Sequence, residues 1–534
     1  MKKVSSIALA LLFAASAFAA DEIIGQLNPY AYSVQGQAKN GKIAVQYSLN
    51  SPADSTIIAI YCDEVEVGTQ VVADNAPGLH NAVVDLADFS AAGTYTVGIR
   101  VYHQSNSDPA QLLRIPEGQT DTAAVSYAFY HPKGVAVDNC PTSANFGRIL
   151  TDEAMSNVPA EGYHSSTDKQ GIYAFDPTFA VIPNGNDRAF KGGVTFHDFL
   201  SNGTSRAYSP YRIRISADGR TFIGMQDDQL DLIYEASEDL QTFTPIVTNA
   251  TVNGMPAMIG SLDIKTDEDG TIHLLALNCN MRGMGYVNYG WELVEYTIAN
   301  DGALSSTVLM DSAALISVLG FQKDVDPIMS VADLNGKQWK TVITPTNTQF
   351  QYAADGGLWY INARSNAFEA ALGHVKADGT WDMLMSRVDL SQEGTGDFYG
   401  GAGMVEYDGK IYVGMNRYSS TVGQIGVFAV DYSGANTTVT YEKSLRAIEI
   451  GRNLNDFAID YGKNLFVVGN SNERLIAFAM PYSGMNETPV DAQVIKTSLD
   501  NVNGEMKATK MIENGKVIII KNGVKYDMLG TVIE

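Results

Sequence analysis

One local pattern recurs along the middle of the chain and limits its fold more than any other feature. An aspartate-glycine turn is followed by a strand in which apolar residues alternate, and the pattern returns about every fifty residues. The interval between Asp269 and Asp355 is too long for one such unit, so it holds either an insertion or a degenerate unit. The copies are Asp218-Gly219, Asp269-Gly270, Asp355-Gly356, Asp408-Gly409 and the looser Tyr461-Gly462.

A repeat of this length favours a ring of β-units. About fifty residues is the size of a four-stranded propeller blade and is too long for one rung of a β-helix. A blade cannot bury its apolar face alone, whereas a closed ring buries it and leaves only short edges exposed. We therefore expect an all-β chain with a six- or seven-bladed β-propeller over residues 129–487, a pair of long β-sandwiches being the alternative. The segment from Asn455 to Phe478 resembles a blade of the NHL-type propellers.

The region before the repeats has a shorter period. From residue 41 to residue 130, apolar and polar residues alternate in short runs such as Lys42–Tyr47, and turn clusters separate the runs. This pattern predicts an antiparallel β-sandwich over residues 20–128. The stretch Gly93–Arg100 and the preceding Gly78–Phe89 resemble FlgD-like immunoglobulin-type domains. The resemblance implies an immunoglobulin-like spacer or assembly module beside a larger unit.

The N-terminus carries an export signal pattern. Lys2 and Lys3 precede an apolar run, Ile7–Ala15, which closes on the small-residue site Ala17-Phe18-Ala19. We take residues 1–19 as a signal peptide, and the absence of a following cysteine argues against a lipid anchor. No other long apolar run occurs, so no membrane span is expected. The mature protein is predicted to lie outside the cytoplasm, secreted or at the cell surface, with the periplasm as a further location.

The C-terminus reads as a separate short module. A strand at Val517–Ile520, a turn at Lys521–Gly523 and a strand at Val524–Met528 predict a hairpin within residues 511–534, after a polar linker over residues 488–510. The tail resembles the C-terminal sorting domains of type IX secretion cargo, which implies recognition by the export and sorting machinery. A hairpin that simply docks on the propeller is the alternative. The matching positions are Gly515, Gly523, Tyr526 and Gly530.

Charge and cysteine usage exclude some classes of partner. The formal net charge is −24, which disfavours nucleic acid and anionic membranes because both require basic patches. Cys62, Cys140 and Cys279 lie far apart without metal-ligand spacing. One disulfide with a free thiol and three buried thiols both fit the sequence, so the fold does not depend on disulfides.

The sequence holds no motif of a familiar catalytic or metal site. There is no HExxH, no Gly-x-Ser-x-Gly elbow and no P-loop. His197 and Asp198 would point to opposite faces of a strand, although a loop could bring them together. The carboxylates of Asp227, Asp228 and Asp231 fit acid–base chemistry on a sugar or a solvated rim. The run Asp267–Gly270 lacks the glutamate of a calcium loop, so an acidic β-turn is preferred. No catalytic residue, metal or cofactor is assigned.

Aromatic residues in glycine-rich loops give the best candidate for a ligand site. Rings with polar tips can stack on sugar faces or grip a peptide, and propellers bind ligands where loops converge over the central channel. Trp359 is a further candidate. The alternative is that Trp291 and Trp359 fill the space between blades. The predicted ligand-binding residues are Tyr286, Tyr289, Trp291 and Tyr399.

Two tripeptides suggest glycosylation. Asp121-Thr122-Ala123 and Asp311-Ser312-Ala313 resemble the Asp-Ser/Thr-aliphatic O-glycosylation motif of some bacteria that use this secretion route. The resemblance implies glycans on Thr122, near the junction of the first two domains, and on Ser312.

These patterns together favour an exported, non-enzymatic protein that binds a glycan or an extracellular protein with one face of the propeller. A glycan-cleaving hydrolase or lyase on that face is the second hypothesis. A structural or assembly protein of the envelope is the third.

Overall fold

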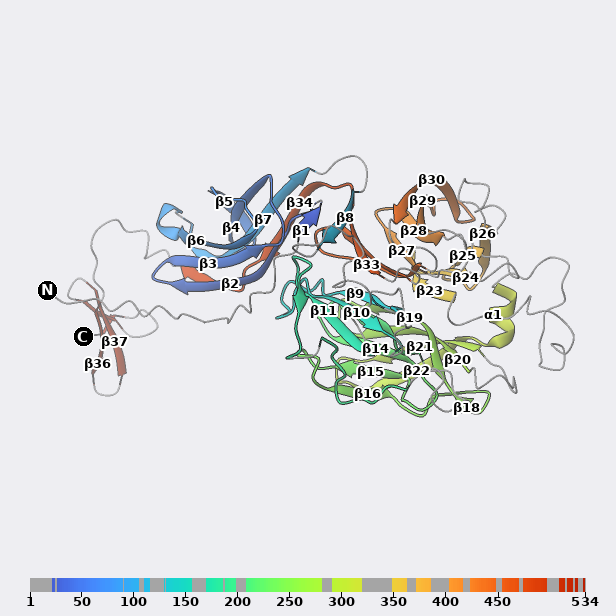
Figure 1. Ribbon diagram of the computed structural model, residues 1–534. Helices are drawn as coiled ribbons and strands as arrows, with labels where there is room; N and C mark the ends of the chain where they lie inside the picture. The colour runs from blue at the N-terminus through green and yellow to red at the C-terminus, as the bar shows by residue number, and fades with distance from the viewer. Residues whose placement is uncertain are drawn as a thin grey trace, which may run out of the picture.

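The computed structural model is built almost wholly of antiparallel β-sheets (Figure 1). Among the described residues, the only helices are α1 (Ser312–Val318) and the 3-10 helix η1 (Leu86–Asp88). Neither has the length and apolar character that crossing a membrane requires. The described residues are 22–24, 26–89, 91–104, 110–115, 129, 131–155, 170–185, 188–197, 208–280, 291–318, 348–362, 371–385, 403–415, 423–447, 454–469, 474–496, 509–513, 516–521, 524–526 and 532–533.

Two sheets near the N-terminus face each other across one apolar core. The strands are β2 (Ala31–Lys39), β3 (Lys42–Leu49), β4 (Ser55–Cys62), β5 (Val65–Val72), β6 (Gly78–Asp85), β7 (Gly93–Gln104), β34 (Ser483–Pro489) and β35 (Val494–Lys496). One sheet has the order β2-β3-β6, and the other has the order β34-β7-β4-β5 with β35 also on β7. Alternation along β3 turns Ile43, Val45 and Tyr47 inward, where they meet Ile99 and Val101 of β7.

A segment from the far end of the chain completes this sandwich (Figure 1). β34 pairs with β7, and Val490 enters the apolar core. The Glu487 carboxylate accepts hydrogen bonds from Arg100 Nε at 2.6 Å and from the Tyr61 hydroxyl at 2.5 Å. The boundary expected between residues 487 and 488 therefore falls inside β34, and the linker expected over 488–510 includes β35. The physical reason is that β7 would otherwise present an unpaired edge.

Six further sheets follow one another along the chain. The first three comprise β9 (Val135–Val137), β10 (Ile149–Glu153), β11 (Gly171–Phe175) and β12 (Val181–Ile182); β13 (Tyr208–Ile215), β14 (Thr221–Gln226), β15 (Ile233–Ala236) and β16 (Phe243–Val247); and β19 (Met258–Thr266), β20 (Ile272–Cys279), β21 (Trp291–Ile298) and β22 (Leu304–Met310). A small hairpin, β17 (Thr251–Val252) and β18 (Met255–Pro256), lies between the second and third sheets.

The remaining three sheets lie nearer the C-terminus. They comprise β23 (Thr348–Tyr352), β24 (Leu358–Asn362), β25 (Ala371–Val375) and β26 (Trp381–Met385); β27 (Met404–Tyr407), β28 (Lys410–Met415), β29 (Gly423–Asp431) and β30 (Thr438–Ala447); and β31 (Leu454–Ile459), β32 (Asn464–Gly469), β33 (Arg474–Ala479), β8 (Ala110–Ile115) and β1 (Glu22–Ile24).

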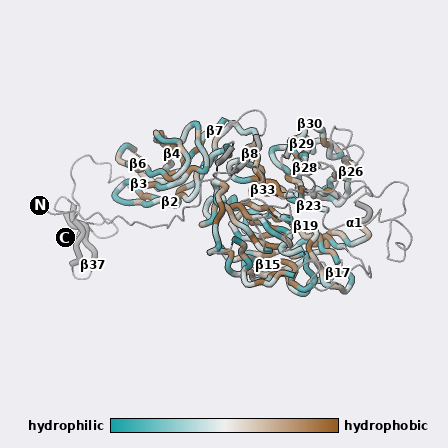
Figure 2. The backbone as a smooth tube through the Cα atoms, viewed as in Figure 1, coloured by the Kyte–Doolittle hydropathy of each residue, from teal (hydrophilic) through white to brown (hydrophobic). Residues whose placement is uncertain are grey.

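Six apolar clusters close these sheets into a ring. One cluster lies between each neighbouring pair of sheets, including the sixth and the first, where Phe466 and Val468 share a cluster with Tyr173 and Phe175. Apolar stretches, brown in Figure 2, gather between the sheets of the ring. The sheets thus bury apolar side chains against the neighbour on either side, and the result is a propeller-like ring of six sheets.

The sixth sheet is completed by a strand that precedes the ring in the sequence. β8 pairs with β33, Leu112 standing opposite Ala477, and β1 pairs with β8. The ring is therefore closed by hydrogen bonds between its two ends as well as by apolar packing.

The repeated turns of the sequence connect the first strand to the second in five successive sheets. Gly219 and Gly270 adopt φ values of 88° and 85°, a region that residues with a Cβ rarely occupy. The long interval between Asp269 and Asp355 contains an insertion rather than a degenerate sheet, because its extra residues follow the complete third sheet at α1 and the fourth sheet then packs directly on the third.

The first strands of the sheets in the ring run parallel to one another. The amide of Phe350 bonds Ser261 Oγ at 3.3 Å, and two residues further along both strands the amide of Tyr352 bonds Asp263 Oδ2 at 2.8 Å. The first strands therefore begin on one face, and we call this the start face: the face where β9, β13, β19, β23, β27 and β31 begin.

The cysteines and the tail complete the description. Cys62, Cys140 and Cys279 are buried free thiols, which selects one of the two alternatives that the sequence leaves open. The tail is a four-stranded sheet, β36 (Thr509–Glu513), β37 (Lys516–Lys521), β38 (Val524–Tyr526) and β39 (Val532–Ile533), in which β37 and β38 pair across the expected turn. The predicted signal peptide lies outside the described residues.

The role of β34 and β35 can be tested by truncation. A chain that stops after Tyr482 loses the partner of β7 and the core residue Val490, so the sandwich should lose much of the roughly 5–15 kcal/mol that stabilises a domain. Hydrogen exchange at the amides of Ile99 and Val101 should accelerate strongly, while the amides of β20 in the ring serve as an internal reference. A control chain that stops after Lys496 should keep the wild-type exchange rates. Unchanged protection of β7 in the shorter chain would show that β34 is dispensable.

Candidate functional site at the axis of the ring

Asp456 is the polar hub of the ring. It is fully buried at the beginning of β31. Its carboxylate accepts two hydrogen bonds from Arg214 of β13, at 2.7 and 3.0 Å, one from the amide of Val135 at 3.0 Å and one from Gln349 Nε2 at 3.2 Å. Four of the six sheets therefore meet on one carboxylate.

Arg214 connects a fifth sheet to this hub. Its Nε lies 3.5 Å from Asp263 Oδ1 of β19. Burial opposes the charged form of Arg214, but the carboxylates of Asp456 and Asp263 raise its pKa above the ordinary value. Burial raises the pKa of Asp263, and Arg214 opposes that shift. The remaining sheet, the fifth along the chain, is joined to the fourth by Gln351 Nε2, which donates to the carbonyl of Met404 at 2.7 Å.

β-Bulges occur where several of these residues enter the axis. The pairing shifts register between Tyr208 and Arg212 in β13, between Ile259 and Ser261 in β19, and between Leu454 and Asp456 in β31. A bulge re-aims the following side chains, and bulges are frequent beside functional sites. Here they precede Arg212, Asp263 and Asp456, the charged residues of the axis.

A second pair of charged residues lies beside the hub, and its bonding is incomplete. Arg212 is fully buried and donates from Nη1 to the carbonyl of Lys133, but its Nε and Nη2 have no hydrogen-bond partner in the part of the chain that the structure describes. Asp152 accepts hydrogen bonds from the amides of Lys133 and Gly134 at 2.6 and 2.8 Å through Oδ1, whereas Oδ2 has no partner. Burial raises the pKa of Asp152 to about 7. We call Arg212 and Asp152 the open pair.

A histidine and an aspartate form an ordered dyad near the start face. His197 Nδ1 lies 2.8 Å from Asp227 Oδ2, and the amide of Gln229 donates to Asp227 Oδ1 at 2.9 Å. Asp227 is buried, whereas the His197 side chain is 29% exposed. A buried carboxylate that orients a partly exposed imidazole is the arrangement of a general base. The sequence pairs His197 with Asp198, but the structure gives it Asp227 from the loop after β14.

The dyad and the open pair belong to one network of backbone contacts. Gln170 Nε2 donates to the carbonyls of both His197 and Ala154, at 3.1 and 3.2 Å. The amide of Ala154 donates to the carbonyl of His131, two residues before Lys133. Among the described residues no three His, Cys, Asp or Glu side chains form a group that could hold a metal ion.

The two tryptophans singled out by the sequence lie between sheets. Trp291 is 6% exposed in the cluster between the third and fourth sheets, and Trp359 is fully buried and donates from Nε1 to Glu406 Oε2 at 2.8 Å. These positions match the alternative in which both rings fill the space between blades, and neither ring presents a free face to a ligand.

The other predicted ligand residues, Tyr286, Tyr289 and Tyr399, lie outside the described residues. The strands that their segments connect, β20 to β21 and β26 to β27, end and begin at the start face.

The predicted modification sites and the acidic turn have separate positions. Thr122 lies outside the described residues. Ser312 is half-buried, and its Oγ donates to the carbonyl of Trp291 at 2.9 Å and accepts from the amide of Trp291 at 3.0 Å, which fastens α1 to β21. Asp269 accepts a hydrogen bond from the amide of Thr271 at 2.9 Å, as an acidic β-turn requires.

The axial residues have a recognisable position in the sequence. Arg212, Asp263 and Gln349 each lie six residues before the aspartate of a repeated turn. A charged or amide side chain at this position of an otherwise apolar first strand marks the axis of the ring.

Comparison with known proteins does not assign the chain. No family model and no curated protein matches it. A glucose dehydrogenase structure covers 66% of this chain and 97% of its own at 9% identity, with a TM-score of 0.35. The polysaccharide lyase Uly1 covers 84% and 89% at 11% identity and 0.32, and an alpha-L-arabinanase of Penicillium chrysogenum covers 85% and 92% at 10% identity and 0.27. These likenesses are too distant to indicate an activity.

The raised pKa of Asp152 predicts a pH dependence of stability. Between its ordinary value of 3.8 and about 7, the folded chain keeps a proton that the unfolded chain has lost, so this group's contribution to stability falls as the pH rises through that window. Asp152→Asn is uncharged at every pH and keeps an oxygen for the amides of Lys133 and Gly134. It should match wild type near pH 4 and exceed it at pH 8 by up to about 4 kcal/mol in the free energy of unfolding.

Urea denaturation from pH 4 to pH 8 measures this difference. The exposed Asp88→Asn variant, which makes the same charge change in the sandwich, should leave the pH profile of the ring unaltered. A wild-type profile that runs parallel to that of Asp152→Asn would contradict a raised pKa at this position.

Proposed function

We propose that this chain is an exported glycan-binding protein in which a six-bladed β-propeller holds an acidic sugar unit at its axis. The observation that supports this most is the open pair: a buried guanidinium with two nitrogens that donate to no described residue, beside a carboxyl group with one such unpaired oxygen. Buried polar groups without partners are costly and usually mark a ligand or solvent site. A carboxylate satisfies the guanidinium by two parallel hydrogen bonds, and a neighbouring hydroxyl satisfies the carboxyl oxygen.

The electrostatics of the axis favour an anion in an otherwise acidic protein. Arg212 is buried there with no hydrogen bond to a carboxylate among the described residues, whereas Arg214 is bonded to Asp456. Because the pKa of Asp152 is raised to about 7, this carboxyl is partly neutral at physiological pH. A uronic acid unit supplies both a carboxylate and adjacent hydroxyls, which is the combination that the open pair lacks.

The sequence supplies the rest of this proposal. Residues 1–19 direct export, the immunoglobulin-like sandwich acts as a spacer, and the sorting-like tail addresses the protein to the cell surface or the medium. The aromatic segments around Tyr289 and Tyr399 contact the ligand at the start face. A glycan on Thr122 accords with a protein exported to the cell surface, whereas a glycan on Ser312 would replace the hydrogen bond that its hydroxyl donates to the carbonyl of Trp291.

A binding experiment with matched variants tests the role of Arg212. Titration of trigalacturonic acid into the mature chain should give saturable binding, and neutral galactotriose should bind less tightly. Arg212→Met should weaken binding of the acidic probe by at least about tenfold, since hydrogen bonds to charged groups contribute about 1.5–3 kcal/mol. Arg220→Met is the matched control, because Arg220 pairs with Glu235 at 2.7 Å in the second sheet. Equal affinity for the acidic and neutral probes would overturn the proposal.

The His197–Asp227 dyad favours a second candidate function, in which the protein cleaves its glycan. An imidazole held by a buried carboxylate can take a proton from a sugar carbon or from water. His197→Gln keeps a polar side chain but cannot act as a base. Turnover of a polysaccharide panel, followed by the release of reducing ends, should then fall by about 10²-fold or more while binding persists. Wild-type protein that binds without releasing products would leave binding as the function.

A further inference from the structure

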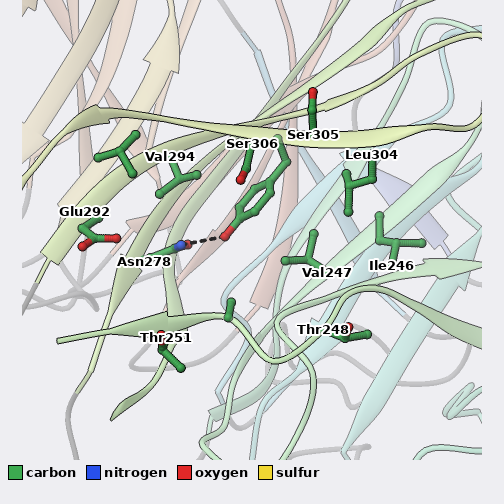
Figure 3. A pocket seen from close by; sticks show the side chains of 13 residues that line it. Ile246, Val247, Thr248, Thr251, Asn278, Glu292, Val294, Leu304, Ser305 and Ser306 are labelled. Atoms are coloured by element: carbon green, nitrogen blue, oxygen red, sulfur yellow. Dashed lines mark hydrogen bonds between the residues drawn. The ribbon is translucent and has the colours of Figure 1, made fainter. Parts of the chain in front are cut away.

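A cavity of about 360 Å³ lies between the second and third sheets, where residues of β16 face residues of β20, β21 and β22 (Figure 3). One wall is the end of β16 and the chain that follows it, including Thr248 and Thr251. The other wall is one face of the third sheet, from β20 to β22. Ligand pockets in proteins begin at about 300 Å³, so the cavity has room for a small molecule.

The floor of the cavity contains an unsatisfied buried amide. Asn278 is 2% exposed, its Nδ2 donates to the hydroxyl of Tyr296 at 2.7 Å, and its Oδ1 has no hydrogen-bond partner among the residues described. Figure 3 shows this hydrogen bond within the cavity. Whichever way the amide is turned, one of its polar atoms meets Tyr296 and the other is left without a partner. An unsatisfied buried group of this kind is expensive unless something binds to it.

The surrounding side chains present hydrogen-bonding groups and an apolar surface together. Glu292 stands directly opposite Asn278 in the pairing of β20 with β21. Further along β21, alternation brings Val294 and Tyr296 to the same wall, and Ser306 of β22 stands opposite Tyr296. The cavity therefore combines an amide, a carboxylate and a hydroxyl with an aliphatic and an aromatic side chain.

We propose that this cavity is a second binding site, which takes one neutral hexose unit. A hexose has an apolar C–H face that suits Val294 and Tyr296, and hydroxyl groups that can donate to Asn278 and Glu292. The carboxylate of Glu292 repels an anionic sugar, so this site differs in charge preference from the open pair. The site stands independently of any ligand at the axis, because the two share no residue.

The experiment uses the whole mature chain with galactose, glucose and mannose as probes. Saturation-transfer NMR and titration should show millimolar binding of at least one hexose. Ser306→Tyr fills the mouth from an exposed position on β22 and should weaken that binding by at least about tenfold. Thr307→Tyr is the matched control: it places the same ring on the same exposed strand, but Thr307 does not line the cavity, and affinity should stay as in wild type.

Three outcomes would overturn the proposal. They are no binding of any of the three hexoses, equal binding by Ser306→Tyr and wild type, and displacement of the hexose by methylamine at similar concentration, which would indicate a cation site. Arg212→Met should leave hexose binding at the cavity unchanged, so failure of this proposal and failure of the axial proposal are separately visible.

Discussion

The ion pair between Arg214 and Asp456 is the interaction on which the geometry of the ring depends. Apolar clusters hold each sheet to its neighbours, but apolar side chains tolerate some sliding, whereas a buried ion pair does not. Asp456 meets the first, second, fourth and sixth sheets, and Arg214 adds the third. Breaking such a pair by removing one partner destabilises proteins by about 3–5 kcal/mol, although apolar replacement of both is often neutral. Its main contribution here is therefore to fix the register of strands that share no backbone hydrogen bonds.

Strand β13 carries two arginines, Arg212 and Arg214, that differ in their hydrogen bonding. Arg214 has both of its terminal nitrogens bonded to Asp456, so its charge is used within the fold. Among the described residues, Arg212, two residues earlier on the same side of β13, donates to one carbonyl and lies 4.6 Å from the centroid of the Tyr211 ring, and Asp152 Oδ2 beside it accepts no hydrogen bond. Arg214 and Asp456, whose hydrogen bonds are complete, hold the ring together. The open pair, whose hydrogen bonds are incomplete, leaves donors and one acceptor available to a ligand. The bulge between Tyr208 and Arg212 aims the side chains in this way.

The fold was more predictable from the sequence than the site, and the reason is physical. The turns at Asp218-Gly219 and Asp269-Gly270 need a positive φ, so glycine marks them wherever they recur, and the period follows directly. The residues of the axis come together only when six separate strands converge. Asp227 reaches His197 across 30 positions, and Arg214 reaches Asp456 across 242. Local patterns do not record such contacts, so the sequence points to the aromatic loops and not to the charged axis. The pairing of β34 with β7 was not predicted for the same reason: Ser483–Pro489 has no strand pattern of its own, and its partner lies about 380 positions away.

The crossed ends of the chain have a kinetic consequence. β8 is synthesised before the ring, and its edge opposite β1 is paired only when β33 follows; the corresponding edge of β7 is paired by β34, about 380 positions later. Neither the sandwich nor the ring can close until nearly the whole polypeptide has emerged, so contact order is high and folding is expected to be slow. Until then the unpaired edges of β7 and β8 can pair with wrong strands. The nascent chain is therefore exposed to misfolding and aggregation until β33 and β34 have been synthesised. Once β8 has paired with β33 and β34 has paired with β7, the sandwich and the ring hold each other in place. Cleavage of the backbone at a single site would then not release an intact ring.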